Sequence, residues 1–275
     1  MTAQNNQPLL QVGDLEKQFK VTRRQGLLSR RDVVHAVDGV SFNLERGRSL
    51  GIVGESGSGK STLARCVLRL EDTTNGTVRF DGEDVLELRA QELKAYRRRA
   101  QMIYQDPYSS LNPRQRIGDA VVEPLKVHGI GDPAEHRDLV IAMLSKMGLS
   151  SDFAFRFPHE LSGGQRQRVG IARALISRPE LVVCDEAVSA LDVSVQAQIL
   201  NLLKQLQKDE DLTYLFITHD IGVVRFIADD IIVMYQGKVV EQGTVEAVID
   251  SPQHEYTKKL ISAIPTGSER RGDVA

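Results

Sequence analysis

A glycine-rich loop at Gly54–Ser61, with the sequence Gly-Glu-Ser-Gly-Ser-Gly-Lys-Ser, has the spacing of a phosphate-binding loop. Glycine accepts positive φ and lacks Cβ, so the backbone can curl around an anion and direct its N–H groups at the oxygens. Lys60 adds a positive charge for the outer phosphates, and the hydroxyl of Ser61 can bind Mg²⁺. An apolar run over 49–53 and a helical pattern over 61–68 give the strand–loop–helix setting that this motif needs. The sequence therefore predicts a nucleoside triphosphate site comprising Gly54, Glu55, Ser56, Gly57, Ser58, Gly59, Lys60, Ser61 and Thr62.

Two carboxylates, Asp185 and Glu186, stand at the end of a second apolar run that we interpret as a buried strand over 181–185. Carboxylates at the carboxyl end of a parallel strand point into the same crevice as the phosphate loop. Asp185 can then help to hold Mg²⁺, directly or through water, while Glu186 can orient and deprotonate an attacking water.

A short stretch with the sequence Leu-Ser-Gly-Gly-Gln precedes a predicted helix over 166–176. A serine hydroxyl and bare glycine N–H groups at a helix N-terminus can bind a second anion. One triphosphate loop and two anion sites suggest that one of these sites serves the nucleotide of a neighbouring chain. The residues of this second site are Ser162, Gly163, Gly164 and Gln165.

Polar side chains also follow two further predicted strands. Gln105 comes after a strand over 101–104 and can contact Mg²⁺ or the lytic water; His219 comes after a strand over 215–218 and can donate a hydrogen bond to the γ-phosphate. A lone histidine is more often structural than catalytic, and a structural role is our interpretation of the others. These are His35, His128, His136, His159 and His254.

From residue 50 onward, strands and helices alternate, which favours a parallel sheet. Residues before that read as strands over 9–15, 18–21 and 33–44, with a charged loop over 23–32. Residues 115–148 have the spacing of two amphipathic helices separated by 129–133, with a helix start at Asp132-Pro133. This pattern indicates a helical insert in an α/β core. A helix over 193–209 and a strand over 231–234 complete the pattern.

Composition narrows the class of protein. The 275 residues carry a net charge of −2, which argues against a nucleic-acid binder that relies on global charge. The two cysteines, Cys66 and Cys184, have no neighbours at metal-ligand spacing, which makes zinc and iron–sulfur sites unexpected and suits a reducing cytoplasm. The sequence shows no run of apolar residues long enough for a membrane span and no signal peptide, so we expect any membrane connection to come through a partner.

Taken in order, these motifs resemble the ATP-binding cassette of ABC transporters, over roughly residues 9 to 264. Gly54–Ser61 resembles the Walker A motif, and Leu181–Glu186 resembles Walker B. The remaining motifs are Gln105 as the Q-loop, Leu161–Gln165 as the signature, Ser189–Asp192 as the D-loop and His219 as the switch histidine.

The resemblance implies an α/β fold with a P-loop NTPase (RecA-like) core, an antiparallel β subdomain and an inserted helical subdomain. The expected boundaries are a single ATPase domain over 9–264, with the core over about 9–105 and 165–245 and the helical subdomain over 106–164. Residues 250–275 would form a C-terminal tail whose end is frayed.

The resemblance also implies residue roles. Each ATP would be held between Walker A of one subunit and the signature of the other, in a head-to-tail dimer. Catalysis would fall to Glu186, His219, Gln105 and Lys60, and Mg²⁺ would be bound by Ser61, Gln105 and Asp185. Phe19 is similar in position to the aromatic residue that stacks on adenine, although it can equally be an ordinary strand residue.

Three segments are similar to the oligopeptide and dipeptide importer branch, which also includes nickel and glutathione importers. They are Tyr104–Pro113, Asp192–Gln198 and His254–Pro265. Many relatives carry proline where this chain has Ala187, a departure that touches no catalytic group. Some carry a cysteine-rich extension for an iron–sulfur cluster, which is not expected here.

We therefore expect an ATPase that powers peptide uptake from the cytoplasmic face of the inner membrane. Its partners would be two permease subunits, a second ATPase or a copy of itself, and, indirectly, an extracytoplasmic solute-binding protein. The segment 104–124 would dock a cytoplasmic helix of the permease, or serve only as an interlobe linker. Alternatives are import of nickel or glutathione, a soluble cassette ATPase acting on iron–sulfur assembly, translation or DNA, and a regulatory nucleotide-binding module.

Overall fold

Two sheets and a group of helices make up the computed structural model, which describes residues 7–25, 28–106 and 111–263. The larger sheet has the strand order β10-β9-β3-β8-β7-β6, and the smaller has the order β2-β1-β4-β5. The larger sheet is formed by β3 (Ser49–Val53), β6 (Ala100–Ile103), β7 (Leu181–Asp185), β8 (Thr213–Thr218), β9 (Asp230–Tyr235) and β10 (Lys238–Thr244).

The strands of the larger sheet are parallel except for β10, which pairs antiparallel with β9. Every residue of β3, β7 and β8 is buried, which explains why these strands read as continuous apolar runs. Successive side chains of a strand point to opposite faces. In β7, Val183 joins the core on the β1 side of the sheet, while Val182 and Cys184 join the core on the α7 side.

The smaller sheet is antiparallel and consists of β1 (Leu10–Gln25), β2 (Leu28–Leu44), β4 (Asn75–Phe80) and β5 (Glu83–Asp84). The expected loop over 23–32 is wrong, because β1 and β2 continue pairing as far as Gln25 and Leu28. The separate strands expected over 9–15 and 18–21 are a single strand with register irregularities. Beyond Glu16, β1 pairs with β2 alone, and the two strands form a two-stranded ribbon. Such a ribbon is held by backbone pairing, so the sequence need not show the hydrophobic alternation that marks a half-buried strand.

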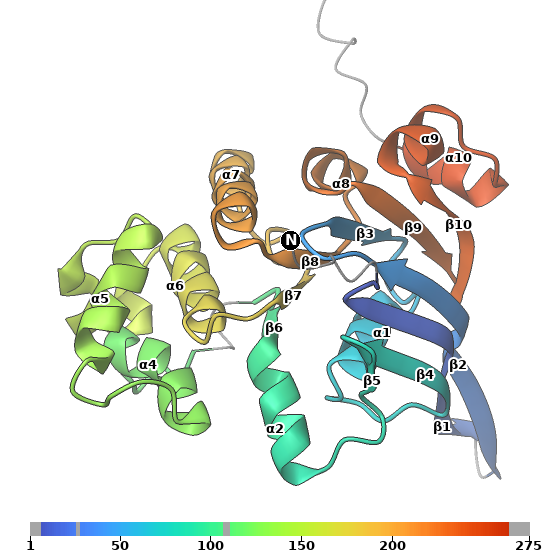
Figure 1. Ribbon diagram of the computed structural model, residues 1–275. Helices are drawn as coiled ribbons and strands as arrows, with labels where there is room; N and C mark the ends of the chain where they lie inside the picture. Colours follow the sequence, from blue (N-terminus) through green and yellow to red (C-terminus); the bar gives the residue numbers. More distant parts are fainter. Residues whose placement is uncertain (1–6, 26–27, 107–110, 264–275) are drawn as a thin grey trace, which may run out of the picture.

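Helices cover both faces of the larger sheet (Figure 1). Helix α1 (Lys60–Val67) packs between the two sheets, and α7 (Val193–Glu210) and α8 (Ile221–Ile227) cover the opposite face. Helices α4 (Ile117–His128), α5 (His136–Lys146) and α6 (Gly163–Leu175) form a separate group at the β6 edge, with the short helices η1 (Ser151–Phe155) and η2 (Pro158–Glu160). The remaining helices are α2 (Ala90–Arg99), α9 (Val245–Asp250) and α10 (Glu255–Ser262).

The two amphipathic helices expected within 115–148 are present as α4 and α5. The expected helix start at Asp132-Pro133 is wrong, because these residues form a turn in which the Asp132 side chain accepts a hydrogen bond from the Ala134 N–H group. A side-chain bond of this kind is a local alternative to helix, and α5 begins at His136. Helix α6 begins earlier than expected, at Gly163, because Ser162 caps it.

Candidate nucleotide-binding site

The phosphate loop joins β3 to α1, and its glycines allow close approach to other backbone segments. Gly54 and Gly59 have φ of 155° and 102°. A Cβ at Gly54 would lie 2.2 Å from the carbonyl oxygen of Met234, and one at Gly59 would lie 2.0 Å from that of Ala36. A residue with a side chain fits at neither position, so β9 and β2 fix the shape of the loop from two sides.

Lys60 begins α1 and is only 4% exposed. Its Nζ donates hydrogen bonds to the carbonyl oxygens of Gly54 at 2.7 Å and of Glu55 at 2.8 Å. Burial lowers the pKa of Lys60 below its ordinary value, opposed by the charges of Glu186, Asp185 and Glu55. A buried ammonium group is costly unless it has an anionic partner, so this loop favours the arrival of a phosphate.

Ser61 and Asp185 meet across the sheet. The Ser61 hydroxyl donates a hydrogen bond to Oδ1 of Asp185 at 2.8 Å, although β8 lies between the strands that precede the two residues. Asp185 is 7% exposed, and burial raises its pKa, with the Ser61 hydrogen bond opposing. A buried carboxylate beside a hydroxyl oxygen suits a hard cation. The described ranges contain no cluster of three or more histidine, cysteine or acidic residues that could hold a metal ion.

Glu186 joins two other polar residues. Gln105 Nε2 donates a hydrogen bond to its Oε2 at 2.9 Å, and His219 Nδ1 lies 3.3 Å from its Oε1. Glu186 has φ of 48°, in the left-handed region that a residue with Cβ seldom adopts, and its N–H group donates to the carbonyl oxygen of Ile217. The ends of β6, β7 and β8 thus bring Gln105, Glu186 and His219 together, as the sequence predicts for strand ends of a parallel sheet.

Several of these groups, though not Asp185 or His219, line one cavity of about 510 Å³, a size typical of ligand sites. Residues 56, 57 and 59–62 of the loop region line it together with Gln105 and Glu186. Sequence reasoning missed the opposite wall, which consists of Val34, His35, Ala36 and Gln236. The one available signal was the Gln236-Gly237 pair, which marks a turn between two strands.

Comparisons with known proteins agree with this geometry. A family model described as "ABC transporter" matches residues 37–189. The chain is 48% identical over 276 residues to the oligopeptide transport ATP-binding protein AppF of Bacillus subtilis, covering 100% of this chain and 83% of AppF. It is 47% identical over 259 residues to the dipeptide transport ATP-binding protein DppF of Escherichia coli K12, covering 94% of this chain and 77% of DppF.

The chain belongs to the ABC transporter family. It is an ATPase of this family, of the class that serves importers. It is also 48% identical over 271 residues to the glutathione import ATP-binding protein GsiA of Escherichia coli K12, but spans only 43% of that protein. Among solved structures, it matches the dimeric post-hydrolysis structure of the ATP-binding cassette MJ0796 bound to ADP and Pi. That match has a TM-score of 0.74 and 31% identity, and covers 86% of this chain and 98% of the other.

The residues that resemble the signature lie apart from this cavity within one chain. Ser162 Oγ accepts a hydrogen bond from the Gln165 N–H group at 3.3 Å, and Gln165 Oε1 accepts one from the Ser162 N–H group at 2.9 Å. This capping box starts α6. A Cβ at Gly164 would lie 2.5 Å from Val195 Cγ1, so α6 and α7 pack closely there. Neither Ser162 nor Gln165 is among the residues that line the cavity.

Phe19 does not line the cavity, but it is close to one wall. It pairs across the ribbon with Val34, which does line the cavity, and the side chains of such a pair share a face. The Phe19 ring is 36% exposed, and Lys17 Nζ lies 4.8 Å from its centroid. The ring is therefore accessible, and its role toward adenine stays a prediction.

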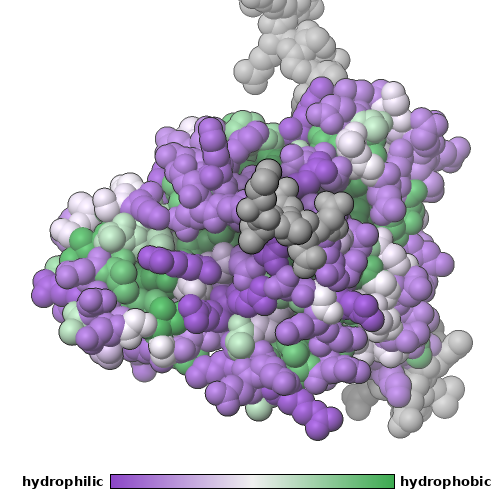
Figure 2. Space-filling model, in the orientation of Figure 1, coloured by the Kyte–Doolittle hydropathy of each residue, from purple (hydrophilic) through white to green (hydrophobic). Residues whose placement is uncertain are grey.

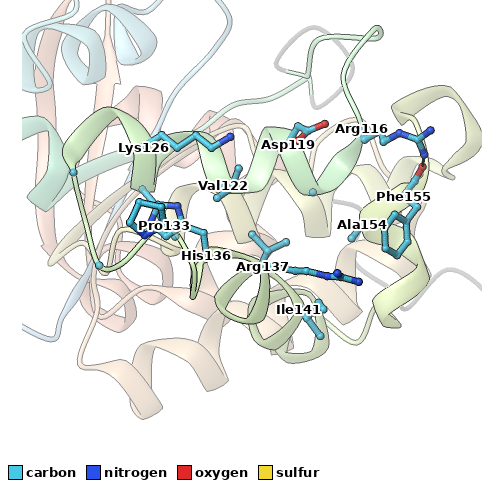
Figure 3. A pocket seen from close by; sticks show the side chains of 15 residues that line it. Arg116, Asp119, Val122, Lys126, Pro133, His136, Arg137, Ile141, Ala154 and Phe155 are labelled. Carbon is cyan, nitrogen blue, oxygen red and sulfur yellow. Dashed lines mark hydrogen bonds between the residues drawn. The ribbon is translucent and has the colours of Figure 1, made fainter.

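A second cavity, of about 680 Å³, lies within the helical group between α4, α5 and η1 (Figure 3). Apolar side chains such as Val122 and Ile141 line it, with Arg116, Lys126 and Arg137 among its charged groups. Figure 2 shows hydrophobic residues gathered on the side of the molecule where these helices lie. None of the described helices is both long and apolar enough to cross a bilayer.

Proposed function

We propose that this chain hydrolyses ATP to power the uptake of short peptides through a membrane permease. ATP hydrolysis is supported above all by one observation: Lys60, Ser61, Gln105 and Glu186 line the same cavity. Peptide cargo is supported by the similarity to AppF and DppF, which extends over nearly the whole chain. The similarity to GsiA supports glutathione as the second candidate cargo. Nickel remains a third candidate, because the importer branch that this chain resembles also includes nickel importers.

In this proposal, the residues of the site divide phosphate binding, Mg²⁺ binding and proton transfer among themselves. The loop N–H groups and Lys60 bind the phosphates, together with Thr62, which lies in the first turn of α1. Ser61, Asp185 and Gln105 would hold Mg²⁺, which neutralises phosphate charge when bound. Glu186 accepts a proton from the attacking water, and Gln105 and His219 hold its carboxylate in place through their contacts with it. His219 is also positioned to contact the γ-phosphate.

We propose that the signature acts on the nucleotide of a partner. Ser162, Gly163 and Gly164 lie at the N-terminus of α6, where N–H groups and the helix dipole favour an anion. The MJ0796 cassette, of similar fold, is described as dimeric. A head-to-tail dimer, with itself or with a second ATPase, would place this N-terminus opposite a phosphate loop. ATP would then stabilise the closed dimer because it contacts both chains, and hydrolysis would let the dimer open.

The helical subdomain, proposed as 106–164 within a single domain over 9–264, is the expected permease contact. Four residues that line the 680 Å³ cavity, Arg116, Gly118, Asp119 and Val122, fall within the segment 104–124 that the sequence predicts to dock the permease. Apolar walls with a charged rim suit an amphipathic helix. The chain would then sit at the cytoplasmic face of the inner membrane, held by two permease subunits, and would meet a solute-binding protein only through them.

A nucleotide-binding measurement tests the proposed cradle. Lys60→Ala removes the buried ammonium group, and we expect ATP affinity to fall by at least about tenfold, because hydrogen bonds to charged groups are worth roughly 1.5–3 kcal/mol. Titration with a fluorescent ATP analogue measures the affinity, and phosphate release measures turnover. The control is Lys94→Ala, which removes an exposed lysine on α2. Equal affinity of Lys60→Ala and the unaltered chain would contradict the assignment.

Cargo and location need a cellular experiment. Cells that lack the gene should lose uptake of a labelled dipeptide and regain it with the unaltered chain but not with Lys60→Ala. Loss of labelled glutathione uptake, with dipeptide uptake intact, would favour the second candidate. The chain should also co-purify with membranes through its permease; recovery free of membranes would favour a cassette ATPase that serves no transporter.

A further inference from the structure

Helix α10, at the C-terminal end of the described residues, contacts the phosphate loop directly. The hydroxyl oxygen of Tyr256 accepts a hydrogen bond from the backbone N–H group of Glu55 at 2.9 Å, across 201 positions of sequence. Glu55 is the second residue of the loop, and it does not line the nucleotide cavity. Tyr256 therefore holds the loop from its outer side and leaves the inner side open for phosphate.

The tyrosine itself is held firmly. It is only 9% exposed and packs in a core cluster with Val53, the residue that immediately precedes the loop. Its ring lies on the ring of Tyr235 in β9, with centroids 4.3 Å apart. Because both the ring and the hydroxyl have fixed partners, the position of the hydroxyl is determined by the core rather than by solvent.

The start of α10 is anchored to β10. The carboxylate of Glu241 accepts hydrogen bonds from the N–H groups of Gln253 at 2.7 Å and His254 at 3.0 Å. His254 Nδ1 in turn accepts a hydrogen bond from the Tyr256 N–H group at 3.1 Å. A continuous set of bonds therefore runs from β10 through the first turn of α10 to the phosphate loop.

We propose that Tyr256 is a positioning residue for ATP binding, which holds the Glu55 peptide so that the phosphate loop keeps its binding shape before the nucleotide arrives. The loop residue is fixed from two directions, since the Glu55 carbonyl accepts from Lys60 Nζ at 2.8 Å while its N–H group donates to Tyr256. A preorganised site binds more tightly because less conformational freedom is lost on binding. This inference rests on the proposed nucleotide site and adds the C-terminal segment to it.

The test is the substitution Tyr256→Phe in the full-length chain, which keeps the ring and removes the hydroxyl. We expect ATP affinity to fall by about fivefold, the ratio that one ordinary hydrogen bond is worth, while kcat at saturating ATP is unchanged. The matched control is Tyr214→Phe, whose lost hydroxyl donates to the Leu203 carbonyl at 2.9 Å. That variant should melt at a lower temperature but bind ATP like the unaltered chain, which separates positioning from general stability.

Two further measurements support the test. Glu241→Ala releases the start of α10, and it should weaken ATP binding in the same direction as Tyr256→Phe. Coupling between sites is reciprocal, so ATP should slow hydrogen exchange across α10 in the unaltered chain and not in Tyr256→Phe. Equal ATP affinity in Tyr256→Phe and the unaltered chain would overturn this inference while leaving the nucleotide site intact. Failure of the unaltered chain to bind the ATP analogue would instead overturn the proposed function, and this inference with it.

Discussion

At the scale of residues, Glu186, which follows β7, contacts one polar side chain that follows β6 and one that follows β8. Its two carboxylate oxygens have different partners, Gln105 on Oε2 and His219 on Oε1. A carboxylate held in this way is oriented before any water arrives, which is what a general base needs. Its direct neighbour Asp185 is instead bound to Ser61. The adjacent acidic residues therefore belong to two separate hydrogen-bonded groups.

Glu186→Gln tests the role of this carboxylate. The amide keeps the shape of the side chain but cannot accept the proton of water, so we expect ATP binding to persist while hydrolysis falls by about 100-fold or more. Phosphate release measures turnover, and light scattering should show an ATP-dependent dimer that accumulates. Glu87→Gln, at an exposed position, serves as the control. Ordinary turnover in Glu186→Gln would remove this residue from its proposed role.

At the scale of elements, α6 depends on its close packing against α7. Gly164 faces Val195 at a distance that leaves no room for a methyl group, whereas a Cβ at Gly170, on the same helix, would meet no atom within 4 Å. Gly164 therefore permits close contact between α6 and α7, whereas Gly170 makes no such contact and only lowers the stability of its own helix.

The paired substitutions Gly164→Ala and Gly170→Ala test this difference. We expect Gly164→Ala to lower the free energy of unfolding by about 1–3 kcal/mol through overpacking, and Gly170→Ala to raise it by roughly 0.5–1 kcal/mol through helix propensity. Urea denaturation measures both values. If both substitutions changed the free energy of unfolding by the same amount, α6 and α7 would be able to move apart at Gly164 without loss of stability.

An ion-pair network joins the end of α2 to three connecting segments, at the opposite end of the larger sheet from the nucleotide site. Arg99, at the end of α2, contacts Asp81 at 2.6 Å and Glu180 at 2.5 Å, and Arg46 contacts the same two carboxylates. Hydrogen bonds from Arg99 hold the pKa of Asp81 and of Glu180 below their ordinary values. Lowered pKa values in the folded state mean that the stabilisation is present above the unfolded values, near pH 4, and is lost as the pH falls through the folded ones.

Arg99→Gln should therefore destabilise the protein at pH 7 more than at about pH 3. The difference at pH 7 should be no more than about 1 kcal/mol, since the side chains remain about one-third exposed and are screened by water. Urea unfolding at both pH values measures it, with the exposed Arg79→Gln as the control. A constant difference across this range would show that the ion pairs do not titrate as proposed.

The elements show why only part of the molecule could be predicted from the sequence. Strands such as β3, β7 and β8 are buried on both faces, so their apolar runs were recognisable, and the motif residues that follow them were predicted. The strands of β1 and β2 were expected only in part: their continuation through 23–32 was missed because β1 pairs there with β2 alone, and β10 was missed because it is only partly buried. Val34 and Gln236 reach the cavity only through the pairing of distant strands, and no local pattern encodes that proximity.

At the scale of the whole molecule, the two elements that we propose to bind anions do not meet within one chain. The phosphate loop opens into the cavity beside β2, while Ser162 caps α6 in the helical group. In our proposal, a second chain brings the two elements together.

Ser162→Asp tests this arrangement without disturbing the helix. Aspartate is as good an N-cap as serine, so the melting temperature should be unchanged, but its charge would repel a phosphate and lower ATPase activity by roughly 100-fold. Thr244→Asp, at the cap of α9, is the matched control. Mixing Ser162→Asp with Lys60→Ala should restore activity, because one of the two shared sites in a mixed dimer is then intact. Activity in the mixture no greater than the sum of the two parts would contradict head-to-tail pairing.

The left-handed backbone at Glu186 has a consequence for how the protein tolerates change. At φ of 48°, any residue with Cβ is strained by on the order of 1 kcal/mol, and glycine is not. Glycine would relieve this strain, but it would also remove the carboxylate that contacts Gln105 and His219 and that we propose as the general base. In our proposal, the strained backbone at this position is therefore a cost in folding stability that accompanies the placement of a carboxylate at the end of β7.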